Sequence, residues 1–130
     1  MVTLFDEFIA VLGNDTFIYD DESSKELVHK MCTSFPFTTW ARIDWDAVVE
    51  QQDVENIDLV PSLLGEKLCY VIWGDGSIPV IKANIQSIVD HIDDAIIVSF
   101  DMRLCDLNFQ KIVEFYHDGE TKFGLRNKDS

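Results

Sequence analysis

The sequence predicts an α+β domain in which helices pack on one side of a mostly antiparallel sheet. Apolar residues recur at helical spacing in the first third of the chain and again around residues 85–92. The second half holds two strand–turn–strand patterns, centred on residues 74–77 and 118–119. Since no internal repeat or low-complexity linker divides the chain, residues 1–130 are expected to form a single acidic domain.

The first helix is expected over residues 4–12. Thr3 can cap its first turn, because a side-chain oxygen there accepts a backbone N–H, and the Gly and Asn at residues 13–14 end it. A short strand is expected at residues 17–19, which are apolar or aromatic. The apolar face of the first helix is expected to hold Leu4, Phe5, Phe8, Ile9 and Leu12.

A second helix is expected after the polar run at residues 20–24, which can cap it. It must end near Phe35, because the residue before a proline, here Pro36, disfavours helical backbone angles. Residues 37–45 are rich in aromatic and β-branched types and predict a strand or extended segment. The buried face of the second helix is expected to hold Leu27, Val28, Met31 and Cys32.

The centre of the chain is less strongly patterned. Residues 46–52 predict a short helix, and the polar residues 51–59 predict a loop. The apolar residues 67–73 and 78–82 predict a hairpin, because the glycines between them supply turn conformations at little steric cost.

The last third is expected to contain one helix and three strands. Asn84 can cap the helix, and the β-branched residues 95–100 predict a strand after it. Residues 111–116 and 121–125 flank an Asp-Gly pair and predict a second hairpin. The apolar face of the helix is expected to hold Ile85, Ile88, Val89 and Ile92.

The charge of the chain is strongly negative and unevenly spread. It carries 24 acidic and 10 basic residues, a formal net charge of −14, and residues 1–65 hold 13 of the acids but three of the bases. Such a field repels nucleic acid and anionic membrane surfaces and accelerates the encounter with a basic partner. We therefore expect no nucleic-acid partner, no membrane partner and a protein partner of positive charge.

The sequence holds no motif typical of catalysis or of a cofactor site. The histidines lie outside any zinc signature, and the phosphate-binding loop and the G-x-S-x-G elbow are absent. His91 and Asp94 could share a helical face, but we interpret this pair as part of the solvated outer face of the helix. We expect a protein that is not an enzyme, with no catalytic residue, no metal and no cofactor.

Cysteine usage and the N-terminus bear on location. The three scattered cysteines are expected to be small buried hydrophobic residues in a reducing compartment. The first residues lack the basic and apolar regions of a signal peptide, and no stretch approaches the ~18 apolar residues of a membrane span. A cytoplasmic location is expected.

The acid-rich stretch at residues 37–58 is the predicted partner-binding face. Trp40 and Trp45 lie within it, and aromatic anchors surrounded by charge are typical of interface hot spots. The alternative is that both tryptophans belong to the core, where we also expect Trp73. The acidic candidates in this stretch are Asp44, Asp46, Glu50, Asp53, Glu55 and Asp58. A second candidate patch consists of Asp20, Asp21 and Glu22.

Three segments carry a family resemblance. Residues 70–77 (YVIWGDGS), 97–100 (IVSF) and 113–120 (VEFYHDGE) resemble small immunity proteins of bacterial toxin–immunity pairs, in particular those of contact-dependent growth inhibition systems. The resemblance covers mainly residues 67–125 and implies a cytoplasmic antidote that binds the C-terminal toxin domain of a secreted effector. Such toxins are often basic nucleases, including tRNA-cleaving ones. The resemblance transfers no role to any single residue.

The leading hypothesis is an immunity protein that binds a cognate basic toxin domain, expected to be a nuclease, and occludes its active site. Its carboxylates would lie where the phosphates of the substrate otherwise bind. The alternative is a small cytosolic adaptor or regulatory protein whose acidic surface serves solubility and has no toxin partner. A third possibility, an enzyme that uses a carboxylate or His91, requires a distinct pocket or metal site.

Overall fold

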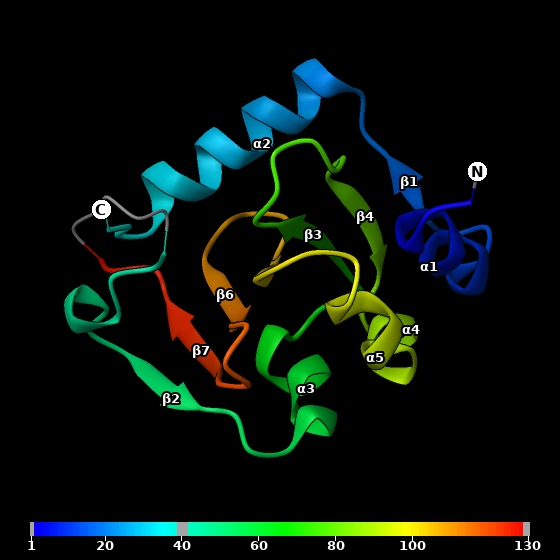
Figure 1. Ribbon diagram of the computed structural model, residues 1–130. Coiled ribbons are helices and arrows are strands. Elements are labelled where there is room, and N and C mark those ends of the chain that lie inside the picture. Colours follow the sequence, from blue (N-terminus) through cyan, green and yellow to red (C-terminus); the bar gives the residue numbers. More distant parts are fainter. Residues whose placement is uncertain (1, 39–41, 129–130) are drawn as a thin grey trace.

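The structure is a computed structural model that describes residues 2–38 and 42–128, and these form five helices and a seven-stranded sheet (Figure 1). Every strand pair is antiparallel, which confirms the predicted α+β class. The two shortest strands form the two edges of the sheet. In order across the sheet, the strands are β1 (Phe17–Ile18), β4 (Ile81–Asn84), β3 (Leu68–Trp73), β5 (Met102–Cys105), β6 (Lys111–Phe115), β7 (Thr121–Leu125) and β2 (Gln51–Asp53).

Three helices begin at the caps that the sequence predicts. Thr3 forms a reciprocal capping box with Asp6, and Asp20 accepts a hydrogen bond from the backbone N–H of Ser23 at 2.7 Å. Asn84 caps its helix in the same way, at 3.0 Å. The helices are α1 (Leu4–Leu12), α2 (Asp21–Ser34), α3 (Val60–Leu64), α4 (Ile85–Asp90) and α5 (Ile92–Ile96).

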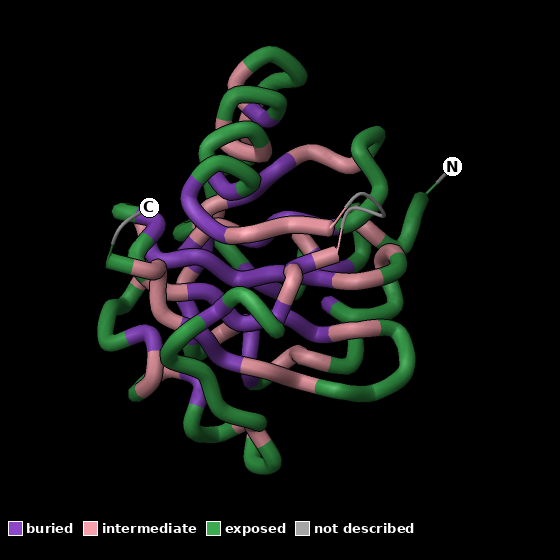
Figure 2. Tube along the Cα trace, turned by 90° about the vertical axis from the view of Figure 1, so that its left-hand side faces the viewer, coloured by how far each residue is buried: buried purple, intermediate pink, exposed green. Residues whose placement is uncertain are grey.

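Helices cover both faces of the sheet, so the expectation that they lie on one side is wrong. On one face, α1, α3, α4 and α5 pack against strand residues such as Val71 and Leu104. On the other face, α2 packs over Ile72 through Met31, and Figure 2 shows this helix above the buried strands. The physical reason is that β3 is apolar on both of its faces, and each face must be covered.

Two segments have a structure other than the predicted one. Residues 46–52 are not a helix: a 3₁₀ turn, η1 (Trp45–Ala47), leads into β2, which pairs with β7 and replaces part of the predicted loop. Residues 95–100 are not a strand, because α5 continues to Ile96 and the chain then bends. The Ala95 carbonyl accepts a hydrogen bond from the Trp73 indole at 3.0 Å, and this tertiary contact overrides the strand propensity.

Further elements were not predicted at all. These are α3, β5 and the 3₁₀ turn η2 (Ile57–Leu59), which shortens the predicted loop at residues 51–59. In the predicted extended segment, Phe37 and Ile43 form an isolated antiparallel bridge, and residues 39–41 lie outside the described residues. Trp73 is 4% exposed, which confirms its expected place in the core.

The cysteines divide into two classes. Cys69 and Cys105 are fully buried, as expected, and burial raises the pKa of both thiols. Cys32 is exposed, so the expectation that it belongs to the buried face of the second helix is wrong: its neighbour Met31 is the residue that faces the sheet. Within residues 2–38 and 42–128, none of the helices has the length and apolar character that a membrane span requires.

Candidate functional site

Trp45 attaches the start of the predicted acidic stretch to the sheet. Its ring lies directly on Gly124 of β7, where an added Cβ would stand 2.8 Å from the ring carbon Cζ3. The Lys122 amine lies 5.9 Å from the ring centroid, within the range of a cation–π interaction. Since Trp45 is 8% exposed, it belongs to the core, and its role as a binding anchor stays a prediction.

Glu114 and three hydrogen-bond donors form a buried group, here called the Glu114 ion cluster. This cluster also holds the acidic stretch on the sheet. The Glu114 carboxylate is 1% exposed and accepts hydrogen bonds from Trp45 Nε1 at 2.9 Å and Arg42 Nε at 3.4 Å. Its other oxygen accepts from Arg103 Nε at 3.0 Å across the β5–β6 pair. A buried carboxylate is costly unless it is paired and hydrogen-bonded, and here three donors satisfy it.

Two side-chain amides hold the backbone that follows Trp45. The Gln51 amide donates to the Val48 carbonyl at 2.9 Å. The Asn127 amide donates to the Ala47 carbonyl at 2.7 Å and accepts from the Val49 N–H at 3.0 Å. The segment that carries the acids is therefore held in place even though it contains little regular structure.

The structure places the six acids of the predicted stretch along one edge of the sheet, here called the acidic edge. Asp44 is half-buried, and with Asp46 it lines a depression of about 270 Å³. Asp53, on β2, pairs with Lys122 at 3.6 Å. In Figure 1 the segment runs from η1 through β2 towards α3. The exposed acids of this edge are Asp46, Glu50, Asp53, Glu55 and Asp58.

The second predicted patch is separate from the acidic edge. Asp20, Asp21 and Glu22 are exposed, but they follow β1, whereas the acidic edge lies along β2 at the opposite side of the sheet. The hydrogen bond from Ser23 that caps α2 lowers the pKa of Asp20. This residue thus has a structural role of its own. Trp40 lies outside the described residues.

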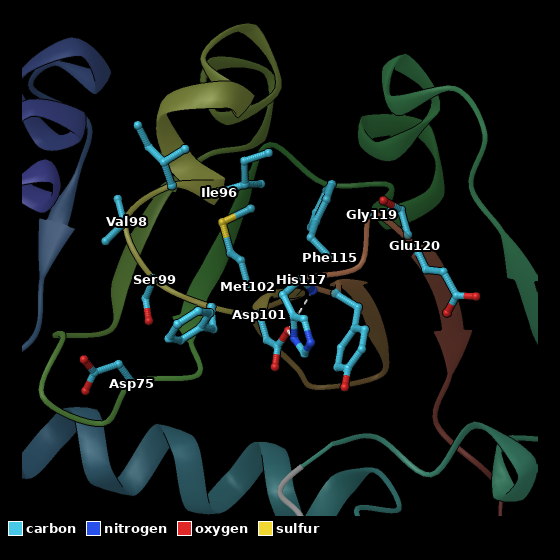
Figure 3. Close-up of a pocket in the computed structure, with 14 residues that line it drawn as sticks. Asp75, Ile96, Val98, Ser99, Asp101, Met102, Phe115, His117, Gly119 and Glu120 are labelled. Carbon is cyan, nitrogen blue, oxygen red and sulfur yellow. Dashed lines mark hydrogen bonds and ion pairs between the residues drawn. The ribbon is translucent and has the colours of Figure 1, made fainter.

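A larger cavity, which we call the large hollow, lies between the chain after α5 and the β6–β7 hairpin. Its volume is about 640 Å³. Figure 3 shows Ile96 and Val98 along one side, with Asp75 and Glu120 at opposite ends. Met102 and Phe115, both buried, line it as well. The cavity therefore combines an apolar lining with carboxylates.

Asp101 and His117 contact one another at the centre of the large hollow. Asp101 Oδ1 lies 3.0 Å from His117 Nδ1 and accepts a hydrogen bond from the His117 backbone N–H at 2.9 Å. The Gly74 N–H donates to the carbonyls of Phe100 and Asp101 at 3.2 and 2.8 Å. A Cβ on Gly74 would lie 3.1 Å from the Phe100 oxygen, so glycine permits the close approach of these two loops.

The acidic edge and the large hollow meet at the β6–β7 turn. Glu120 lines both the small depression and the hollow, and it pairs with Arg42 at 3.2 Å. The Arg42 guanidinium also lies 3.5 Å from the centroid of the Tyr116 ring, which lines the hollow. The two surfaces are therefore neighbours in space.

The sequence prediction missed the large hollow because its apolar residues lie in the segment that was expected to be a strand. The cluster of Ile96, Ile97 and Phe100 next to Asp101 is the signal that could have indicated it. Among the side chains that the structure describes, no three of the His, Cys, Asp or Glu types are arranged to hold a metal ion.

The chain matches a known family over nearly its whole length. The family model described as CdiI immunity protein, EcoliA0-like, matches residues 2–124. No curated protein matches the chain. The matched range includes the whole acidic edge and every residue that lines the large hollow.

Proposed function

Because this chain belongs to the CdiI immunity protein family, we propose that it binds the cognate toxin domain of a contact-dependent growth inhibition system and occludes the active site of that domain. The toxin domain is proposed to be basic and to be the C-terminal part of a secreted effector. Binding takes place in the cytoplasm of the cell that makes the immunity protein. The protein acts by binding alone and does not catalyse a reaction.

The observation that carries this proposal is the acidic edge. Its five exposed carboxylates stand on a segment that Trp45, the Glu114 ion cluster and two side-chain amides hold against the sheet. A backbone held in place before binding loses little freedom when the carboxylates that it carries meet a basic surface. The net charge of −14 strengthens the same attraction at long range.

A nuclease is the toxin class that this surface fits best, and a tRNA-cleaving nuclease is included in the proposal. Such an enzyme binds phosphates through lysine and arginine side chains. The carboxylates of the acidic edge can pair with those side chains and exclude the substrate. Standard protein–protein complexes bury about 800 Å² on each partner. The contact surface is therefore expected to extend beyond the small depression.

The first test mixes the purified protein with its cognate toxin domain and measures RNA and DNA cleavage. We expect cleavage to stop at a one-to-one ratio, and inhibition to weaken as salt rises, because the screening length falls to about 3 Å at 1 M ionic strength. Unchanged cleavage in molar excess of the protein would contradict the proposal and would favour the adaptor alternative.

A charge reversal locates the interface. The triple variant Asp46→Lys, Glu50→Lys and Asp53→Lys is expected to slow association with the toxin domain by about tenfold or more, because it reverses the local field. A control with the same net charge carries Glu7→Lys, Asp15→Lys and Glu26→Lys, which are exposed acids outside the acidic edge. Equal on-rates for the two variants, measured by stopped flow, would place the interface elsewhere.

A further inference from the structure

We infer that the large hollow receives a protruding segment of the toxin domain that carries a lysine or arginine next to an apolar side chain. This inference rests on the proposed function and adds a second contact, which lies beside the acidic edge and differs from it in chemistry. The acidic edge carries five exposed carboxylates, whereas the hollow combines an apolar lining with three carboxylates.

Two large apolar side chains at the hollow are exposed to solvent. Phe100 is 76% exposed and Ile97 is 55% exposed, and both line the cavity above buried Met102 and Phe115. Exposed apolar side chains that cluster at a cavity with polar groups are typical of interaction sites. The apolar neighbour of the incoming base would cover these two side chains.

The charge of the lining indicates the sign of the guest. Asp75, Asp101 and Glu120 contribute carboxylates, and the described residues that line the hollow include neither a lysine nor an arginine. His117 and Arg42 each engage one of these carboxylates. A carboxylate has two oxygens and about four acceptor sites, so these three carboxylates can accept further hydrogen bonds from a lysine or arginine of the partner.

The lining is held in shape before any partner arrives. Asp101 has a φ of 42°, a conformation that few residues other than glycine adopt, and its carboxylate anchors His117 on the opposite hairpin. Asp75 accepts hydrogen bonds from the Ser77 N–H and hydroxyl at 2.9 and 2.8 Å. Those bonds lower the pKa of Asp75, which keeps this group ionised. A preformed site loses less entropy on binding.

Charge also favours the toxin domain over other occupants. A second copy of this chain would carry the same net charge of −14 and would be repelled. The cavity volume of about 640 Å³ lies within the range of about 300–1,000 Å³ that suits small ligands, but the solvent-exposed rings at its rim suit a broader partner. A basic loop matches the volume, the apolar rim and the carboxylates together.

The test places a photoreactive benzoylphenylalanine at position 100 in the full chain and irradiates it with the cognate toxin domain. We expect a covalent adduct whose toxin peptide contains a lysine or arginine beside an apolar residue. The control carries the same group at position 17, which is also an exposed aromatic position but lies on β1, away from the hollow. This control is expected to give no adduct. An adduct of the chain with itself, or a toxin peptide without a base, would overturn the inference.

Substitutions give an independent measurement. Ile97→Ser and Phe100→Ser are each expected to weaken toxin binding by about tenfold, while Phe17→Ser should change it by less than about twofold. If the wild-type protein fails to bind the toxin domain, the proposed function fails. If the wild type binds and neutralises the toxin but both hollow variants bind as tightly, only the hollow inference is overturned.

Discussion

The two faces of the sheet are both buried, yet they are built differently. The face beneath α1, α3, α4 and α5 packs apolar side chains such as Val71, Leu104 and Val113 against one another. The face beneath α2 has an apolar cluster too, but it also encloses the Glu114 ion cluster. Glu114 and Arg103 lie directly opposite one another on β6 and β5, at 1% and 3% exposure.

The two faces therefore contribute differently: the first stabilises the fold, and the second positions the acidic edge. Apolar burial is non-directional and scales with area, so the first face stabilises the fold without specifying single contacts. Hydrogen-bonded charges have fixed directions, and those of the second face reach Arg42 and Trp45, where the acidic edge begins. We infer that the polar face determines where the proposed binding carboxylates stand.

The largest expected effect comes from breaking the ion cluster. Glu114→Leu should lower the free energy of unfolding by about 3–5 kcal/mol, because the buried Arg103 then loses the Glu114 carboxylate that neutralises its charge. Urea unfolding measures the change. The double variant Arg103→Met with Glu114→Leu should recover most of this loss, since apolar residues of similar size replace the pair. A double variant as unstable as the single one would contradict this account.

A matched change on the apolar face sharpens the contrast. Leu104→Ala is expected to cost about 2–5 kcal/mol through the cavity that it leaves. At equal folded concentration, however, its association rate with the toxin domain should equal that of the wild type. The Arg103→Met, Glu114→Leu double variant should associate more slowly, because Trp45 loses its acceptor and Arg42 keeps Glu120 but loses Glu114. Equal rates for these variants would show that the polar face does not position the acidic edge.

A smaller effect is expected where the acidic edge contacts β7. Gly124→Ala introduces a methyl group 2.8 Å from the Trp45 ring, and the resulting overpacking should cost about 1–3 kcal/mol. The amide of Val49 should exchange faster with deuterium, since its segment is displaced. Gly76→Ala is the control, because nothing lies within 4 Å of the added methyl group. Equal stability of the two variants would argue against the close contact.

The smallest effect is expected at the cap of α1, on the apolar side. Thr3→Ala removes the side-chain acceptor of the Asp6 N–H and should cost about 0.5–2 kcal/mol. Thr3→Ser keeps the hydroxyl and should remain close to the wild type in thermal unfolding. Toxin neutralisation should be unchanged in both variants. A loss of neutralisation in Thr3→Ala at full folding would show that the apolar face also contributes to the binding surface.

Local signals predicted the elements whose ends are chemically marked. Thr3, Asp20 and Asn84 each accept the backbone hydrogen bond that their position predicted. The hairpin around residues 118–119 formed for the same reason, because glycine and aspartate favour turns locally. The hairpin after β3 also formed, but β4 begins at Ile81 and not at residue 78, so residues 74–80 make a longer connection than the predicted one. Short-range chemistry of this kind can be read in a sequence without knowledge of distant contacts.

The missed elements depend on partners far along the chain. Residues 51–53 are polar, and they form a strand because β7, some seventy residues later, offers its free edge. The segment after Ala95 bends because Trp73 holds its carbonyl. For the candidate site, the sequence indicated the acidic character of residues 44–58 but not the large hollow, whose lining comes from three separate segments.

The sequence by itself determined the acidic character, the capped helices and hairpins and the α+β class, because composition and short-range hydrogen bonding are local properties. Only the tertiary structure decided that helices cover both faces of the sheet and that Trp45 is buried on Gly124. It also separated the two predicted acidic patches onto opposite edges. These features follow from strand order, which depends on pairings between residues far apart in the sequence.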